Sequence, residues 1–285
     1  MRRVALLLGT AVVFVASHTA VAMGRPLIVT TQDHSLADAS YCDHFHTQIS
    51  TSLPSRAHAT EERNMPLSGI EGLKIRASEQ GGVSIHGWDR PYAHLTVCKY
   101  AEGLNDKEAA AALRDVGITF ANGELFTRGP ASASTRVWWI HMILKLPRSA
   151  NVNVISANGG ISIRNMSSKV VAHARNGGIS LASCGGDNKL STENGGIAVE
   201  NVSGKVEATT DKGTISLKLH NSDTTNPTVE ARTSEAGDIV CKSACEGASA
   251  SWNADRTYLR LGSTSMVPAI RLMTTGAPII IDQVR

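Results

Sequence analysis

The chain has 285 residues, a formal net charge of +3 at pH 7 and only 4% aromatic residues. Its positive residues are scattered, without the dense Lys/Arg cluster that marks proteins binding nucleic acid or anionic lipid. We therefore expect no nucleic-acid partner, and the length allows one large domain or two small ones.

Residues 1–22 have the features of a signal peptide. Arg2 and Arg3 form a basic start, an apolar run extends from Val4 to Ala16, and Ala20-Val21-Ala22 fits a cleavage site. The apolar run is shorter than the roughly 20 residues that span a bilayer, and no later stretch is long and apolar enough to do so. The sequence predicts an exported protein, and leaves periplasm, envelope surface and secretion open.

Residues 23–67 are polar and rich in His, Ser and Thr, and we expect an irregular leader there. His44 and His46 alternate in this leader, so in an extended segment both imidazoles could face one metal ion. Their spacing matches no closed zinc pattern, and surface histidines explain it equally well. We expect no metal and no other cofactor, with His44 and His46 as the weak candidates.

Residues 68–285 are predicted to form the folded domain, with an insertion at about 100–136. The insertion contains the best helix pattern, from Asn105 to Val116, with Asn105 as N-cap and Glu108 at N3. Gly117 is expected to end this helix. Asn122-Gly123 then predicts a hairpin turn between two short strands. We interpret the whole block as a decorated turn of the same domain.

A longer apolar strand follows from Val137 to Leu146 and contains Trp138 and Trp139. Adjacent residues on a strand face opposite ways, so at most one of the two indoles should be buried. The other could form an aromatic platform for a glycan. A cover over the inserted helix is the simpler interpretation.

One motif then recurs with an 18-residue period. Its copies begin at Asn158, Asn176, Asn194 and Lys212, and their key positions are Gly160, Ile161, Gly178, Ile179, Gly196, Ile197, Gly213 and Ile215. A fixed period of this size is typical of a supersecondary unit stacked on copies of itself. Each row holds two short alternating strands, so the predicted fold is all-β, a single-domain parallel β-solenoid.

Three side details follow from the alignment of these rows. The asparagines at the start of the first three copies should stack as a hydrogen-bonded ladder. Met166, Cys184 and Val202 should form a further buried ladder, and the glycines should lie at corners that turn sharply or need positive φ.

Beyond residue 217 the rows are stretched. Ile239 resumes the pattern after Ile215 with a longer step than the earlier rows have, and residues 221–227 supply the excess as an inserted loop. We expect the row of Ile239 to follow that of Ile215, and the strand at 279–281 to close the C-terminal end.

The repeated Asn-Gly-Gly-Ile-Ser-Ile motif resembles a family of exported bacterial repeat proteins that carries the label "putative adhesin". The same resemblance includes the segments Asp43-His44-Phe45-His46 and Gly87-Trp88-Asp89-Arg90-Pro91. The resemblance covers roughly residues 68–240. It implies a parallel β-solenoid in the cell envelope and brings no catalytic residues with it.

Five cysteines in an exported chain suggest disulfides. Cys42 with Cys98 is the most attractive pair, because it would tie the leader to the first rows. Cys241 and Cys245 could pair across a tight turn, but are too far apart within a strand. Cys184 falls on an inward ladder and should be a buried thiol.

Acidic residues do not align on the outward positions of successive first strands, as a groove of a glycosidase or lyase would require. Glu193, Glu207 and Asp211 come nearest to a cluster. The sequence thus favours a non-catalytic exported protein that binds a glycan or another envelope component. A self-assembling scaffold and a β-helix carbohydrate-active enzyme are the alternatives, and the oligomeric state stays open.

Overall fold

The computed structural model describes residue 42 and residues 53–67, 72–77, 80–131, 133–220, 227–234, 237–246, 249–263 and 265–284. The predicted signal peptide, His44 and His46 lie outside the described residues, as does most of the predicted leader.

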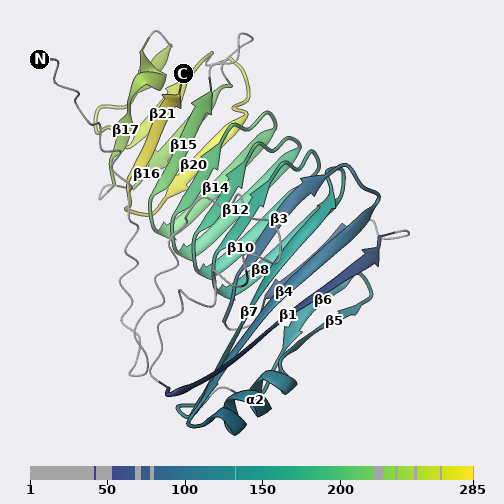
Figure 1. The fold of residues 1–285 in the computed structure, drawn as a ribbon. Coiled ribbons are helices and arrows are strands. Elements are labelled where there is room, and N and C mark those ends of the chain that lie inside the picture. The colour runs from purple at the N-terminus through teal and green to yellow at the C-terminus, as the bar shows by residue number, and fades with distance from the viewer. Residues whose placement is uncertain are drawn as a thin grey trace, which may run out of the picture.

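Two long sheets form the molecule, and the chain alternates between them (Figure 1). Sheet A has ten strands in the spatial order β1 (Ser55–Pro66), β4 (Tyr92–Gly103), β7 (Arg136–Pro147), β3 (Val83–Trp88), β9 (Ile161–Arg164), β11 (Ile179–Ala182), β13 (Ile197–Glu200), β15 (Ile215–His220), β21 (Ile279–Val284) and β17 (Ile239–Cys241).

Sheet B has eleven strands, in the order β18 (Ala250–Trp252), β19 (Tyr258–Leu261), β16 (Val229–Thr233), β20 (Ile270–Thr274), β14 (Lys205–Lys212), β12 (Asp187–Asn194), β10 (Val170–Asn176), β8 (Asn151–Asn158), β2 (Gly72–Ala77), β6 (Glu124–Arg128) and β5 (Gly117–Ala121). Outside the two sheets, the elements within the described ranges include helix α2 (Asp106–Asp115) and the short 3-10 turn η1 (Ser243–Cys245).

The central rows are parallel and keep the register that the sequence predicts. In sheet A, Ile161 pairs with Ile179, Ile179 with Ile197, and Ile197 with Ile215. In sheet B, residues 152, 170, 188 and 206 occupy equivalent positions on β8, β10, β12 and β14. The prediction of a mostly β protein built from rows of this period is confirmed.

The core lies between the two sheets, where alternate residues of each strand meet. The four motif isoleucines are at most 2% exposed. They belong to one continuous cluster of buried side chains that extends from Met65 to Ile281. Met166 and Cys184 are buried in the same cluster, as predicted, and Val202 packs against it half-buried.

The predicted asparagine ladder is present at the start of the motif copies. The side-chain amide of Asn176 donates to Oδ1 of Asn158 at 2.6 Å, and that of Asn194 donates to Oδ1 of Asn176 at 2.9 Å. Each amide can donate to one neighbour and accept from the next, so the ladder links successive rows along the stack.

The first glycine of each pair is required by the close approach of stacked backbones. A Cβ on Gly177 would lie 2.3 Å from the carbonyl oxygen of Gly159, and one on Gly195 would lie 2.2 Å from that of Gly177. A Cβ on the second glycine, Gly178, would meet its nearest neighbour at 3.3 Å. Positive φ is not the general reason, because among the motif glycines only Gly213 has one, at 157°.

The left-handed corners lie elsewhere in the row and were not predicted. Asn165, Ser183 and Asn201, which occupy equivalent positions in successive rows, have φ values of 60°, 52° and 50°. These residues follow the sheet A strand of each row. Asparagine tolerates this conformation better than most residues, because its short side chain can hydrogen-bond locally.

The N-terminal end differs from the predicted decorated turn. β6 pairs parallel with β2, and β7 pairs parallel with β3, so the insertion and the strand after it supply a full extra row. β4 then pairs antiparallel with β7, and β1 antiparallel with β4, which extends sheet A (Figure 1). Residues 55–66, which we expected to be irregular, form the edge strand β1, because their partner strand supplies hydrogen bonds that no local pattern indicates.

The predicted N-cap and hairpin turn inside the insertion are confirmed, whereas Gly117 is not the helix cap, because Val116 takes that position. The side chain of Asn105 accepts a hydrogen bond from the Glu108 backbone at 3.0 Å and caps α2. The helix ends at Asp115, two residues before Gly117, which begins β5. Asn122 and Gly123 have φ values of 51° and 73° and close the β5–β6 hairpin.

The order of the C-terminal rows contradicts the sequence prediction. β21 lies between β15 and β17, so Ile279 pairs with Ile215 on one side and with Ile239 on the other. In sheet B, β20 likewise lies between β14 and β16. After β15 the chain forms the row of β16 and β17, which does not contact the row of β14 and β15 directly. The C-terminal strands β20 and β21 then lie between these two rows. Sequence spacing could not predict this, because both rows carry the same apolar pattern.

Candidate functional site

Four basic side chains lie side by side on the outer face of sheet A, one on each of four neighbouring strands. Strand alternation points His94, Lys145, His86 and Arg164 outward from β4, β7, β3 and β9. Pairing places His94 beside Lys145, Lys145 beside His86, and His86 beside Arg164. We call these four residues the basic ladder.

The members of the basic ladder act on one another electrostatically. Burial lowers the pKa of His86 below its ordinary value, and the positive charges of Arg164, Lys145 and Arg148 lower it further. The ring Nε2 of His86 lies 3.0 Å from the side-chain nitrogen of Asn165. His86 is therefore biased toward the neutral form between two permanent cations.

The two cations beside His86 lack neutralising partners within the described residues. Neither Lys145 nor Arg164 forms an ion pair there. Arg148, which follows β7, differs because its Nε lies 2.9 Å from a carboxylate oxygen of Asp89. Lys145 on β7 and Arg164 on β9 are separated by His86 on β3, and neither cation has an ion-pair partner among the described residues.

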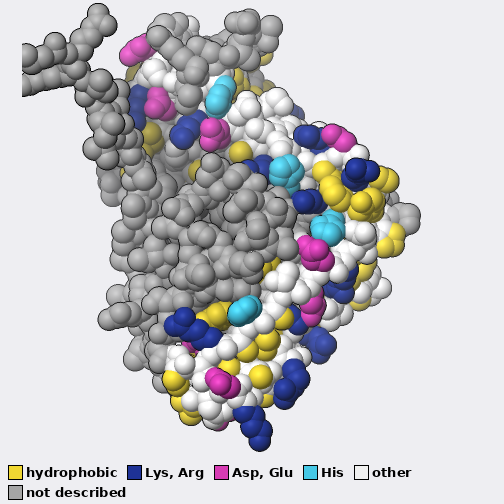
Figure 2. Space-filling model, in the orientation of Figure 1, with side chains coloured by type: hydrophobic (Ala, Val, Ile, Leu, Met, Phe, Trp, Pro, Cys, Tyr) yellow, Lys and Arg dark blue, Asp and Glu magenta, His cyan; other side chains and the backbone are white. Residues whose placement is uncertain are grey.

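Two aromatic side chains lie beside the basic ladder. Trp88 and Tyr92 are half-buried, and they extend the outward positions of β3 and β4. The Trp88 indole N–H donates to the carbonyl oxygen of Tyr92 at 3.0 Å, and its ring centroid lies 6.3 Å from that of His94. Figure 2 shows Lys, Arg and His side chains beside a hydrophobic group on this face, near the end of β3.

The prediction that one of Trp138 and Trp139 forms an exposed aromatic platform is wrong. Both indoles are buried, at 6% and 8% exposed. They do face opposite ways, as predicted. Trp138 packs into the main core and donates to the Pro130 carbonyl oxygen at 2.8 Å, whereas Trp139 packs against Tyr100. Both indoles are therefore closed to a flat ligand, each in its own buried cluster.

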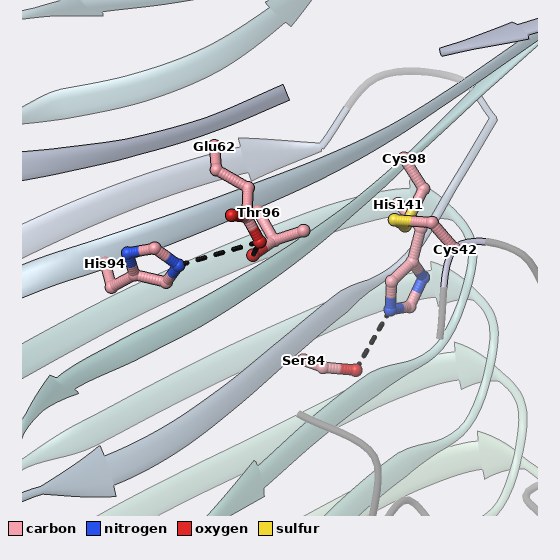
Figure 3. Close-up of a disulfide and its surroundings, with 7 residues drawn as sticks. All are labelled: Cys42, Glu62, Ser84, His94, Thr96, Cys98 and His141. Carbon is pink, nitrogen blue, oxygen red and sulfur yellow. Dashed lines mark hydrogen bonds and ion pairs between the residues drawn. A yellow bond between two sulfur atoms is a disulfide. The ribbon is translucent and has the colours of Figure 1, made fainter. Parts of the chain in front are cut away.

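The predicted disulfide between Cys42 and Cys98 is present. It is buried on the outer side of sheet A against Ile143, and thus ties residue 42 to β4. Next to it, Nε2 of His141 lies 3.0 Å from the hydroxyl oxygen of Ser84 on the neighbouring strand (Figure 3). The serine and histidine are 57 residues apart in sequence, so spacing gave no sign of this contact.

A polar pair connects the disulfide region with the basic ladder. Glu62 on β1 accepts a hydrogen bond from the Thr96 hydroxyl at 3.2 Å, and its carboxylate lies 3.8 Å from Nε2 of His94 (Figure 3). Glu62 thus lies against His94, and Lys145 and Arg164 are the permanently charged members of the ladder.

The other cysteines behave as two separate cases. Cys241 and Cys245 form a disulfide across η1, which brings together two positions that a strand would hold apart. Cys184 is a free, buried thiol, and burial raises its pKa above the ordinary value. Disulfides persist outside the reducing cytoplasm, so the two pairs are consistent with an exported protein.

The acidic residues singled out from the sequence do not form a common site. Glu207 lies 3.7 Å from the Lys189 ammonium, and Glu193 lies 4.0 Å from Nε2 of His173. Glu193 is adjacent to Asp211 on the next strand, but Glu207 is four residues along β14 from Asp211, roughly 13 Å away in an extended strand.

Two hollows lie on the outer side of sheet B. The larger has a volume of about 670 Å³ and includes Lys74, Asn151, Asn153 and Lys169 in its lining. The smaller, of about 260 Å³, lies at the Arg76–Glu124 ion pair. Neither is lined by a candidate site residue that the sequence singled out, and neither is lined by a tryptophan or tyrosine.

Within the described ranges, no group of three or more His, Cys, Asp or Glu side chains could hold a metal ion. The two leader histidines lie outside those ranges, so their prediction stays untested. Among the same residues, no helix is long and apolar enough to cross a membrane.

Sequence reasoning missed the basic ladder because its members are far apart along the chain. Lys145 and His86 are neighbours only through the pairing of β7 with β3, and positive residues seemed scattered. One signal was available, since the alternation of Val83–Ile85 extends to His86 and Trp88 and places both outward.

The sequence matches no protein-family model, and no curated protein matches it. Solved structures do resemble the fold. A "putative cell adhesion protein" from Clostridium sporogenes matches with a TM-score of 0.39 and 12% identity, covering 80% of this chain and 100% of that chain. A "putative adhesin" from Bacteroides fragilis matches with a TM-score of 0.33 and 14% identity, covering 82% and 100%.

A third structure, a "putative adhesin" from Parabacteroides distasonis, matches with a TM-score of 0.31 and 9% identity, covering 80% of this chain and 97% of that chain. The names of these proteins refer to adhesion, as does the label of the family that the repeat motifs of this chain resemble.

Proposed function

We propose that this chain is an exported, non-catalytic β-solenoid that binds a glycan or another envelope component through the outer face of sheet A. The observation that carries the proposal is the basic ladder, whose Lys145 and Arg164 have no ion-pair partner among the described residues, beside Trp88 and Tyr92. Unpaired cations beside aromatic rings are a common composition of binding surfaces.

A rigid sheet suits binding because the outward side chains are already ordered. The ladder residues lie on four neighbouring strands of a continuous sheet, so ligand binding would require little further ordering of the backbone. Glu207 lies apart from Asp211, so the three acidic candidates do not converge on one point.

The test is co-sedimentation of the purified protein with isolated cell envelopes and with insoluble polysaccharides, with an assay for sugar released into the supernatant. Saturable pelleting without released sugar is the expected result. A Lys145→Gln, Arg164→Gln double variant should pellet less. Released sugar would instead identify a carbohydrate-active enzyme, and absence of pelleting with every material would reject the binding function.

End-to-end self-assembly is the other non-catalytic candidate, and β1 argues against it. This edge strand carries Arg56, Glu61, Glu62 and Arg63, and charged side chains on an edge disfavour pairing with another chain. Size-exclusion chromatography at several concentrations separates the two, because a concentration-independent monomer excludes a scaffold.

A further inference from the structure

We propose that the basic ladder binds an acidic polysaccharide with a carboxylate on each sugar unit, lying across the strands of sheet A, with Trp88 against a sugar ring. This inference rests on the proposed function, because it names the ligand class of the same surface. It goes further in predicting charge, spacing and orientation of the ligand.

The first argument is charge. Lys145 and Arg164 flank His86 without an ion pair in the described part of the chain, although three positive groups lower the pKa of that imidazole. Two cations on the outer side of sheet B differ. There, Lys189 lies 3.7 Å from Glu207, and Arg260 lies 3.4 Å from Glu230, so in these two pairs opposite charges neutralise one another across neighbouring strands. Lys145 and Arg164 lack such a partner among the described residues, and an anionic ligand would supply it.

The second argument is spacing. The ladder positions are directly paired on adjacent strands, which lie about 4.8 Å apart in any sheet. This interval is close to the length of one sugar ring in an extended polysaccharide. A polymer with one carboxylate per sugar, running perpendicular to the strands, can therefore bring carboxylates to Lys145 and Arg164, which lie on either side of His86. Charged groups in such register give both affinity and orientation.

The third argument is the aromatic border. Trp88 is on the same strand and the same face as His86, two residues further along. Its indole N–H is engaged by the Tyr92 carbonyl, and its ring meets that of Tyr92 edge-on, with centroids 5.0 Å apart. The indole is thus held in place beside the ladder, and it remains partly exposed to a flat apolar partner. A sugar ring has such a face, whereas a simple inorganic anion does not.

The experiment measures binding of the purified, disulfide-intact protein to polygalacturonate, with neutral dextran and poly-glutamate as comparison polymers. We expect polygalacturonate to bind with an affinity that falls as salt rises, and dextran not to bind. Lys145→Gln with Arg164→Gln should weaken polygalacturonate binding about tenfold or more, because two charge contacts are lost. Trp88→Ala should weaken it further, without restoring dextran binding.

The matched control is Lys205→Gln with Lys212→Gln. It removes the same charge from exposed positions at the two ends of β14, in the other sheet. This control should bind polygalacturonate like the unmodified protein, apart from a small uniform change. Equal loss in the control would show a non-specific charge effect and would overturn the ladder as the site. Thermal unfolding of every variant verifies that these surface changes leave the fold intact.

The remaining outcomes separate the ligand class from the binding function. Failure to bind polygalacturonate, with envelope pelleting that still depends on Lys145 and Arg164, would reject the acidic polysaccharide and leave the proposed function standing. Equal binding of dextran would reject the role of charge. Binding of poly-glutamate as tight as that of polygalacturonate, unaffected by Trp88→Ala, would identify an acidic peptide surface and overturn the inference.

Discussion

Replacing Ile279 with alanine should destabilise the protein as strongly as a substitution in a central row. Ile279 lies close to the end of the chain, yet it is fully buried between Ile215 and Ile239. If the rows followed chain order, this residue would belong to the last strand of the stack. Terminal strands fray, and substitutions in them cost little.

The magnitude follows from burial on both sides. Removing three carbon atoms from a fully buried isoleucine costs roughly 2–5 kcal/mol, because the lost transfer free energy adds to that of the cavity left behind. Ile280, the next residue, points outward and is half-buried. Ile280→Ala is the matched control, and we expect it to cost about 1 kcal/mol or less.

The assay is urea unfolding of both variants with the disulfides intact, together with amide hydrogen exchange of the native protein. The Ile279 N–H donates to the Asp238 carbonyl oxygen at 2.9 Å, and the Ile215 N–H donates to that of Pro278 at 3.2 Å. Both amides should exchange as slowly as those of the central rows. A cost for Ile279→Ala equal to that of Ile280→Ala, or rapid exchange near residue 279, would refute the inserted row.

Three further predictions concern single features. Gly177→Ala should destabilise the stack strongly, because its Cβ would lie 2.3 Å from a carbonyl oxygen, whereas Gly178→Ala, with its nearest contact at 3.3 Å, should be tolerated. Thermal unfolding distinguishes the two variants, and equal melting temperatures would contradict the close approach of the backbones. Cys98→Ala opens a disulfide with a sequence separation of 56 residues and should lower the free energy of unfolding by about 4 kcal/mol, because the unfolded chain regains the entropy of the open loop. Urea unfolding measures this, and a loss under about 1 kcal/mol would contradict that entropic effect. Arg164→Gln should raise the pKa of His86 toward, but not to, its ordinary value, because burial is the largest cause of the lowering and remains; an NMR titration of the imidazole measures this, and an unchanged pKa would show that Arg164 does not act on it.

The sign of the His86 effect also fixes a pH dependence. The folded protein binds a proton at His86 less readily than the unfolded chain does, because the pKa is lowered on folding. The stability that the neutral His86 contributes is therefore fully present above the ordinary imidazole pKa. It decreases as the pH falls from that value through the lowered pKa of the folded state. Removing Arg164 should make the decrease smaller.

The sequence by itself determined the repeating part of this protein. An 18-residue period, with isoleucine at one position and paired glycines before it, permits only rows that stack in register. The helix capped by Asn105 and the Asn122-Gly123 hairpin were also predictable, because capping and turn formation depend on neighbours in the chain.

Tertiary structure decided the two ends and the candidate site. The rows of Ile239 and Ile279 carry the same alternating pattern, so either could have followed Ile215, and only the packing of the whole chain selects the inserted order. Likewise, the pairing of β7 with β3 brings Lys145 beside His86, although the two are far apart in the sequence. Local patterns fix which residues face outward, but which outward residues become neighbours depends on strand order, and strand order is a property of the folded molecule.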